Sequence, residues 1–297
     1  MHTQPILVAV EANQEGRHVM KVADRVARQF QQPLSLINVV KPLTQLYADL
    51  NFSPITERSV EWEQQQASAN KQILEEMACG TSVGEISVEL AQPSDEIVTK
   101  AEALDANLIV MGVHNRKGLD RLLGSTTHAV MNHCDRDILA VHPDSSDIPY
   151  RRVLVALDTS DLSNTVMSKA RQLAADAEYK LLSVTIPLHT VFAMSETGHC
   201  TSASLTQLDE ELNHEVTAKL QANADSHGFT ESEIAIVRGD PREMIIQAAE
   251  EMQADLIVIG SNKRGTLNRL ILGSTARAVL NWTPCDVLVC RQGHNCS

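Results

Sequence analysis

The sequence of 297 residues has few positive charges, few aromatic residues and no long apolar run. It carries 25 Lys and Arg against 38 Asp and Glu, which gives a formal net charge of −13. Such a charge repels polyanions, so we expect no binding to nucleic acid or to an anionic membrane surface, and any phosphate must be held by local donors. No stretch has the length of a membrane span, and the apolar run near the amino terminus lacks the basic flank of a signal peptide.

The six cysteines show no pairing rhythm, and a chain of this length can bury a core without disulfides. They are Cys79, Cys134, Cys200, Cys285, Cys290 and Cys296. We therefore expect free thiols and a cytoplasmic protein. The His and Cys neighbours at 133–134, 199–200 and 294–296 lack the paired spacing typical of zinc sites, so no structural metal is expected.

Motifs of the common nucleotide-hydrolysing and acyl-transfer enzymes are also missing. The sequence contains no Walker A pattern, no Gly-x-Ser-x-Gly elbow and no pair of carboxylates with an evident role. Asp240, before Pro241, offers a carboxylate that would suit Mg²⁺ beside a nucleotide, although Asp before Pro at a helix start is ordinary capping chemistry. An ATPase or phosphotransferase is kept only as an alternative.

The clearest feature that is present is an internal repeat. Residues 255–279, DLIVIGSNKRGTLNRLILGSTARAV, repeat residues 107–130, NLIVMGVHNRKGLDRLLGSTTHAV, with one residue missing from the earlier copy. Each copy runs a buried strand into a glycine, a basic loop and a Gly-Ser-Thr that opens a helix. These residues are Gly112, Gly124, Ser125 and Thr126 in the first copy and Gly260, Gly273, Ser274 and Thr275 in the second. Unpaired N–H groups at a helix start favour phosphate, so the repeat predicts an anion site. The alternative is a purely structural role, because Gly often ends a strand and Ser often caps a helix.

Both halves alternate short apolar strands with longer helical segments. Strands are expected at 6–10, 34–40, 85–90, 108–111 and 137–141, and again at 153–157, 181–186, 233–237, 256–259 and 287–290. This alternation predicts two tandem, doubly wound, five-stranded parallel sheets of the α/β class. The polar segment 142–150 separates domains that we place at residues 1–144 and 150–297. In such sheets ligands bind at the carboxyl ends of the strands where strand order reverses, which is where Asp158 and Gly260 are expected.

The second half resembles the universal stress protein family in three features. Its first strand ends in Asp158, its fourth strand ends in Gly260, and the pair Gly273-Ser274 follows. The resemblance extends over both halves. The tandem arrangement resembles that of two-domain members related to the E-type protein. Nucleotide-binding members carry G-x-x-G-x9-G-[ST]. In the second half Lys263 replaces the middle glycine; in the first half Asn115 replaces it, and eight residues follow in place of nine.

The resemblance implies a cytoplasmic stress-response protein that binds ATP or a related adenine nucleotide, with Mg²⁺ as an optional companion, and acts through conformation or partner binding. It places Asp158 and the Val184 backbone at the base and ribose, and Gly260 beside the ribose-phosphate. The phosphate positions are Lys263, Gly273, Ser274 and Thr275.

The first half is expected to hold a degenerate site, because the deletion re-aims its loop before Gly124 and Glu11 replaces Asp158. A non-nucleotide scaffold, or a stress protein that binds an apolar ligand, is therefore a second alternative. Family members commonly pair along their fifth strand. Covalent linkage thus predicts an intramolecular pseudo-dimer through 137–141 and 287–290, with a homodimer of two chains as a further association.

Overall fold

The computed structural model describes residues 4–43, 57–113, 124–188, 190, 202–261, 272–283 and 285–291. The chain divides into two compact units, with the change from the first to the second between Pro149 and Tyr150. Within the described residues, each unit holds five strands that pair in parallel. The predicted α/β class and the tandem arrangement of two parallel sheets are confirmed.

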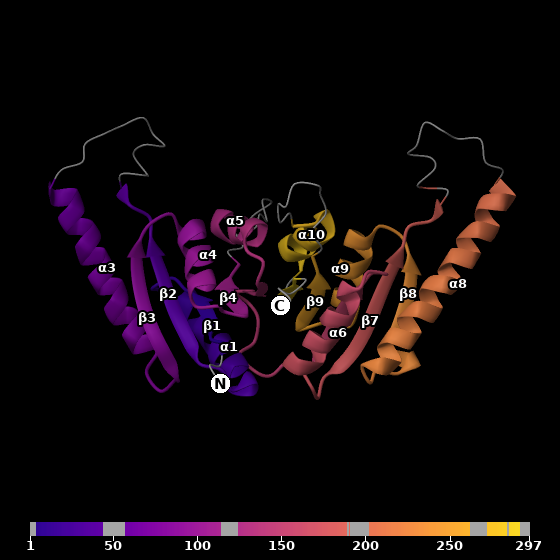
Figure 1. Cartoon of the computed structure of the whole chain (residues 1–297), viewed down its shortest axis with the longest axis horizontal. Helices are drawn as coiled ribbons and strands as arrows, with labels where there is room; N and C mark the ends of the chain where they lie inside the picture. Colours follow the sequence, from indigo (N-terminus) through magenta and orange to yellow (C-terminus); the bar gives the residue numbers. More distant parts are fainter. Residues whose placement is uncertain are drawn as a thin grey trace. The chain divides into compact units, whose positions relative to one another are not determined.

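The first unit has the strand order β3-β2-β1-β4-β5 (Figure 1). Its strands are β1 (Ile6–Ala9), β2 (Leu34–Val40), β3 (Val83–Leu90), β4 (Leu108–Gly112) and β5 (Asp137–Val141). Its helices are α1 (Gln14–Phe30), α3 (Glu57–Met77), α4 (Pro93–Ala103) and α5 (Ser125–His133). The connections from β1 lead outward through β2 to β3, and the chain then crosses back to β4, so strand order reverses between β1 and β4.

The second unit repeats this plan in the order β8-β7-β6-β9-β10. Its strands are β6 (Arg152–Leu157), β7 (Glu178–Thr185), β8 (Ile234–Arg238), β9 (Leu256–Gly260) and β10 (Asp286–Cys290). Its helices are α6 (Leu162–Leu173), α8 (Ser202–Ser226), the short 3₁₀ helix η1 (Glu231–Glu233), α9 (Pro241–Glu251) and α10 (Ser274–Trp282). Strand order here reverses between β6 and β9.

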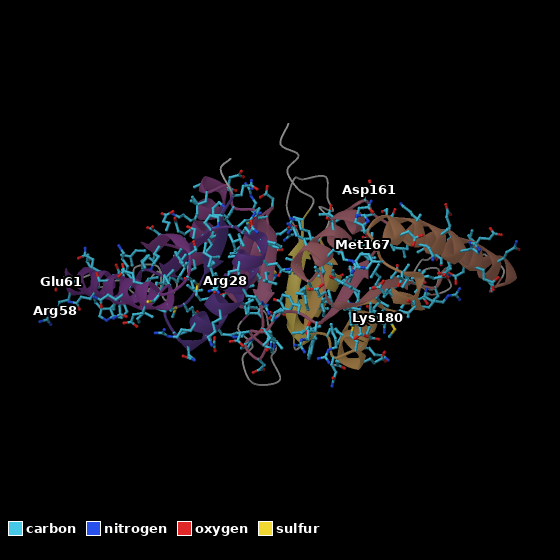
Figure 2. The ribbon with its side chains drawn as sticks, turned by 90° about the horizontal axis from the view of Figure 1, so that it is seen from below. Arg28, Arg58, Glu61, Asp161, Met167 and Lys180 are labelled. Atoms are coloured by element: carbon cyan, nitrogen blue, oxygen red, sulfur yellow. The ribbon has the colours of Figure 1, made fainter. Side chains whose placement is uncertain are left out.

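Helices cover both faces of each sheet, because its right-handed crossovers run in both directions along the sheet. Crossovers that travel in the same direction place their helices on the same face, so α1 and α3 share one face while α4 and α5 pack together on the other. The same rule places α6 with α8 and α9 with α10. Strands buried on both faces must be apolar throughout, and Ile109 and Val258 are accordingly inaccessible to solvent. Figure 2 shows the contrast between charged α3 residues such as Arg58 and Glu61, which are exposed, and Met167 of α6, which is fully buried.

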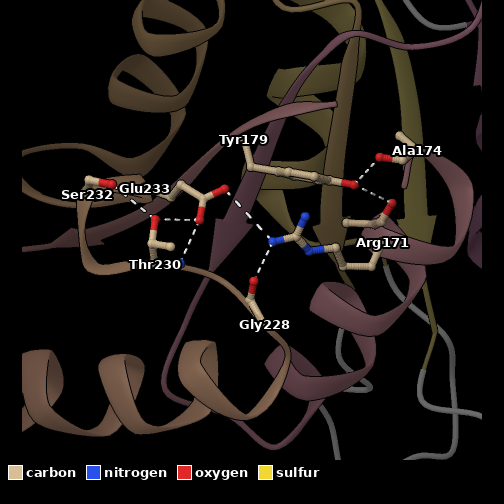
Figure 3. A network of polar contacts seen from close by, with 8 residues as sticks. Arg171, Ala174, Tyr179, Gly228, Thr230, Ser232 and Glu233 are labelled. Atoms are coloured by element: carbon tan, nitrogen blue, oxygen red, sulfur yellow. Dashed lines mark hydrogen bonds and ion pairs between the residues drawn. The ribbon is translucent and has the colours of Figure 1, made fainter. Parts of the chain in front are cut away.

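A cluster of polar and aromatic side chains joins the amino-terminal end of β7 to the end of α6 in the second unit (Figure 3). The Arg171 guanidinium lies 4.4 Å from the ring centre of Tyr179 and 4.0 Å from that of Phe229. Its Nη2 donates to the Gly228 carbonyl at 2.7 Å, and the two aromatic rings meet edge to face. The Tyr179 hydroxyl donates to carbonyls at the end of α6, including that of Ala174. The cluster lies at the sheet edge opposite the strand carboxyl ends, so it stabilises the unit away from the candidate site.

Candidate functional site

The candidate site lies at the carboxyl ends of β6 and β9, which are adjacent parallel strands with Ala156 paired to Ile259. The chain leaves these two strands in opposite directions, toward α6 and toward α10. An open crevice forms at such a reversal, and it is the usual ligand position in doubly wound sheets. Asp158 follows β6 and Ser261 follows β9, so the polar residues after the two strands emerge side by side.

Asp158 belongs to a tightly hydrogen-bonded turn at the start of α6. Its Oδ1 accepts from the backbone N–H of Ser160 at 3.0 Å and from the Ser160 hydroxyl. The Ser163 hydroxyl donates to the Asp158 carbonyl at 2.6 Å and accepts from the Asp158 N–H at 3.2 Å. Among the described residues, the hydrogen bonds of this carboxylate involve Oδ1, and the side chain is exposed. Its second oxygen is therefore left to accept further hydrogen bonds.

The backbone groups of Val184, the predicted base contact, point toward β6. β7 extends beyond β6, whose last residue, Leu157, pairs with Ser183. The carbonyl of Thr185 accepts from Gly239 on the β8 side. Successive residues of a parallel strand direct their backbone groups to opposite neighbours, so the groups of Val184 face the β6 side, beside Asp158.

Gly260 has a packing reason for being glycine. A Cβ at this position would lie 2.7 Å from Leu162 Cδ2 and 3.3 Å from Val166 Cγ2, both on α6. Gly112 occupies the corresponding place in the first unit, where a Cβ would lie 3.2 Å from Val19 on α1. In both units the strand-ending glycine lets the first helix pack closely against the sheet.

The start of α10 is an uncapped helix terminus at the same edge. Its N-cap is Gly273, which has no side chain to accept from the helix, and the first intrahelical bond runs from Arg277 N–H to the Gly273 carbonyl at 3.0 Å. The N–H groups of Ser274, Thr275 and Ala276 precede that bond and have no intrahelical acceptor. Among the described residues, no heavy atom lies within 4 Å of a Cβ placed on Gly273, so they give no steric reason for glycine here.

The corresponding helix start in the first unit is arranged differently. Gly124 is again an N-cap without a side chain, and Ser125 and Thr126 follow it. The next residue is Thr127, whose hydroxyl donates to the Gly112 carbonyl at 3.1 Å and so ties the helix start to the end of β4. Ala276 stands at this place in the second unit and offers no such tie.

The turn after β1 also departs from its counterpart. The Glu11 carboxylate accepts from the Asn13 side chain at 2.7 Å, and Asn13 Oδ1 caps α1 by accepting from the Gly16 N–H at 2.9 Å. Gly16 occupies the place of Ser163, and a Cβ there would lie 1.9 Å from the Glu11 carbonyl oxygen. The two units therefore hold their acidic residues by different means.

Three residues of the edge escaped the motif-based prediction. Ser163 organises the Asp158 turn, and Arg291, directly after β10, donates from Nη1 to the Ser261 hydroxyl at 2.9 Å. Arg291 and Ser261 are 3 % and 4 % exposed. The signal that would have found them is position: a polar residue directly after a buried parallel strand lies at the ligand edge whether or not it belongs to a motif.

The Asp240 carboxylate is engaged within its own turn. It caps α9 by accepting from the Arg242 N–H at 2.8 Å, and the Arg242 guanidinium binds both of its oxygens. Hydrogen bonding from Arg242 lowers the pKa of Asp240 to about 2. A carboxylate held in this way is a poor candidate for Mg²⁺. In the described parts of the chain no group of three or more His, Cys, Asp or Glu is placed to bind a metal ion.

Several predicted residues lie outside the described ranges. Lys263, the substituted middle position of the second phosphate motif, is one of them, and so is Asn115 of the first. The described part of the chain contains no helix with the length and apolar character needed to cross a membrane.

Comparison with known proteins places this architecture in a family. The model of the universal stress protein family matches twice, at residues 2–142 and 149–291. Universal stress protein Rv2623 of Mycobacterium tuberculosis is 23% identical over 296 residues, which cover 97% of this chain and 96% of that protein.

Two solved structures share the fold over nearly the whole chain. A functionally unknown protein, PA1789 of Pseudomonas aeruginosa, is 20% identical with a TM-score of 0.66 and covers 97% of this chain and 92% of its own. A universal stress protein of Archaeoglobus fulgidus is 19% identical with a TM-score of 0.63 and covers 99% and 100%. At these identities the two structures support the fold alone. The two matches of the family model show that the chain belongs to the universal stress protein family, as a tandem two-domain member.

Proposed function

We propose that the second unit binds ATP or a related adenine nucleotide, and that the protein acts in the stress response through the conformation or partner that the nucleotide selects. The Val184 backbone holds the base, Asp158 holds the ribose, and the start of α10 holds the phosphates. Lys263 joins the phosphate site as a prediction from sequence. Mg²⁺ accompanies the nucleotide through its phosphates, without Asp240.

The observation that carries this proposal is the start of α10. Three backbone N–H groups without an intrahelical acceptor and the positive end of a helix dipole favour an anion, and the described residues leave space for one beside Gly273. The Asp158 turn and the Val184 backbone supply the complementary groups at the neighbouring strand ends. Together these groups match the chemistry of a phosphorylated nucleoside, which needs an anion site and a ribose acceptor at one edge.

The proposal is tested by isothermal titration of ATP into the 297-residue chain. We expect saturable binding, with the affinity of Asp158→Ala lower by about tenfold because a charged hydrogen-bond acceptor is lost. Glu11→Ala is the matched control, since it removes the corresponding acid of the first unit and should leave this affinity unchanged. Absence of binding by wild-type protein with an intact circular dichroism spectrum would refute the proposal.

Turnover is a separate question, because no sequence motif identifies a base that would activate water. We infer binding without required hydrolysis. Steady-state phosphate release tests this inference. Release above background that is abolished by Asp158→Ala would establish the alternative of a slow ATPase.

The first unit keeps the fold with an altered site in this proposal. Thr127 ties its helix start to the sheet, and its acidic residue is bonded to Asn13. The predicted pseudo-dimer through β5 and β10 and a homodimer of two chains remain part of the proposal. Mass spectrometry of the denatured supernatant of purified protein identifies any nucleotide that is carried through purification, and a nucleotide-free preparation that also fails to bind ATP would favour the scaffold alternative.

A further inference from the structure

The charged residue nearest the end of β10 is the strongest feature that the proposed function leaves unused. Arg291 is the first residue after β10, and its guanidinium is almost completely removed from water. A guanidinium stays protonated at every accessible pH, so a permanent positive charge is fixed at the carboxyl edge of the second sheet. The same edge holds the start of α10.

Arg291 is linked to the end of β9 through Ser261. Its Nη1 donates to Ser261 Oγ at 2.9 Å, and the Ser261 backbone N–H donates to the carbonyl of Cys290 at 3.0 Å. The serine oxygen accepts from the arginine, so its own hydrogen is directed elsewhere and can be donated to an anion. The pair therefore presents both a charge and a hydroxyl donor between the ends of two adjacent strands.

The first unit has neither element of this pair. His142 follows β5 in place of Arg291, and Val113 follows β4 in place of Ser261. His142 is equally buried, and its Nδ1 accepts from the Asp144 N–H at 3.1 Å. A histidine, unlike an arginine, carries no permanent positive charge. The two units thus differ by one fixed positive charge at corresponding positions.

We propose that Arg291, with Ser261, sets the preference of the second unit for nucleoside polyphosphates over uncharged nucleosides. The inference rests on the proposed function of the same site. A desolvated positive charge interacts far more strongly with an anion than an exposed one does, and polyphosphates carry the largest negative charge among adenine nucleotides. Asp158 and Val184 recognise the ribose and the base, which adenosine and ATP share. Arg291 interacts with the phosphates, which only ATP carries.

The experiment compares the affinities of the full-length protein for ATP, AMP and adenosine by isothermal titration. Arg291→Met removes the charge with little loss of volume, and replacing a buried charge by a well-packed apolar residue commonly leaves a protein folded. We expect ATP affinity to fall by about tenfold or more, AMP affinity to fall less, and adenosine affinity to stay within about twofold. Arg291→Lys keeps the charge and should retain most of the preference for ATP.

Ser261→Ala provides a second variant that does not alter the buried charge. Removal of its hydroxyl should lower ATP affinity by several-fold and leave adenosine binding intact. Thermal melts of all variants give the folded fraction, and Arg291→Gln replaces Arg291→Met if the latter does not fold.

The outcomes separate the two proposals. Wild-type binding of ATP with equal ATP-to-adenosine ratios in Arg291→Met and wild type would overturn the role of Arg291 and leave the nucleotide site standing. No binding of any adenine compound by folded wild type would overturn both. A parallel loss of ATP and adenosine affinity in a folded Arg291 variant would also overturn the inference, because it would show a structural role in place of charge recognition.

Discussion

The Ser163 hydroxyl closes the turn that carries Asp158, donating to its carbonyl at 2.6 Å and accepting from its N–H at 3.2 Å. One side chain from the first turn of α6 thus fixes both backbone groups of the acidic residue after β6. Gly16 at the corresponding place in the first unit has no side chain for this purpose. The conformation of the Asp158 turn is therefore fixed by hydrogen bonds within the protein itself.

Removal of this hydroxyl should weaken both the site and the fold. For Ser163→Ala we expect a loss of about 1–3 kcal/mol in the free energy of unfolding, because both hydrogen bonds to the Asp158 backbone are lost, and a several-fold loss of ATP affinity because the carboxylate is less constrained. Urea unfolding and titration calorimetry measure the two effects. Thr159→Ala changes an exposed residue of the same turn and should alter neither. Unchanged ATP affinity in a folded Ser163→Ala protein would contradict this role.

Gly260 and Gly273 should respond differently to replacement by alanine. Gly260→Ala drives a Cβ to within 2.7 Å of Leu162, so we expect a loss of about 1–3 kcal/mol in the free energy of unfolding from overpacking. Gly273→Ala meets open space and a φ of −58°, and its stability should change by less than about 0.5 kcal/mol.

ATP binding gives the second readout for this pair. A methyl group on Gly273 occupies the space proposed for phosphate and should lower ATP affinity markedly while the fold is unaffected. If Gly273→Ala binds ATP as wild type does, the phosphates lie elsewhere. If Gly260→Ala is as stable as wild type, α6 has room that the structure does not show.

Gly16→Ala should be among the most damaging single methyl additions in the first unit. Its Cβ would lie 1.9 Å from the Glu11 carbonyl oxygen, a distance that only a shift of the backbone can relieve. We expect a loss of about 3 kcal/mol or more in unfolding free energy, measured by urea denaturation. Gly84→Ala in β3 is the control, because its Cβ would make only an ordinary contact of 3.7 Å with the Leu34 carbonyl oxygen. Equal stability of the two variants would contradict the expected strain.

The sequence predicts the sheets well because their signals are local and repeated. Apolar runs such as residues 256–259 and the helix stripe that includes Val166 appear twice at constant spacing, and strand order follows from crossover rules. The position of Gly273 can be predicted for the same reason, because its Gly-Ser-Thr motif is short and occurs in both halves.

Other contacts depend on distances that no motif records. Arg291 and Ser261 are 30 residues apart and meet only because β9 and β10 are neighbours. The packing reason for Gly260 likewise requires the position of Leu162 on a different element. A sequence pattern shows that glycine is present, but it does not separate a glycine that admits a ligand from one that admits a helix.

Tyr179 should give the second unit a stability that declines at high pH. Burial raises the pKa of Tyr179 to about 12, and the charge of Arg171 opposes this shift only in part. Because the folded-state pKa lies above the unfolded value near 10, the contribution is complete below about pH 10 and is lost as the pH rises toward 12. Urea midpoints measured from about pH 9 to about pH 11.5 should fall more steeply for wild type than for Tyr179→Phe, which keeps the ring against Arg171 without the titrating hydroxyl. Identical pH profiles would contradict this prediction, because they would show that the hydroxyl titrates equally in the folded and unfolded states. A tyrosinate absorbance step near pH 12 that is present in wild type and absent in Tyr179→Phe would identify the titrating group directly.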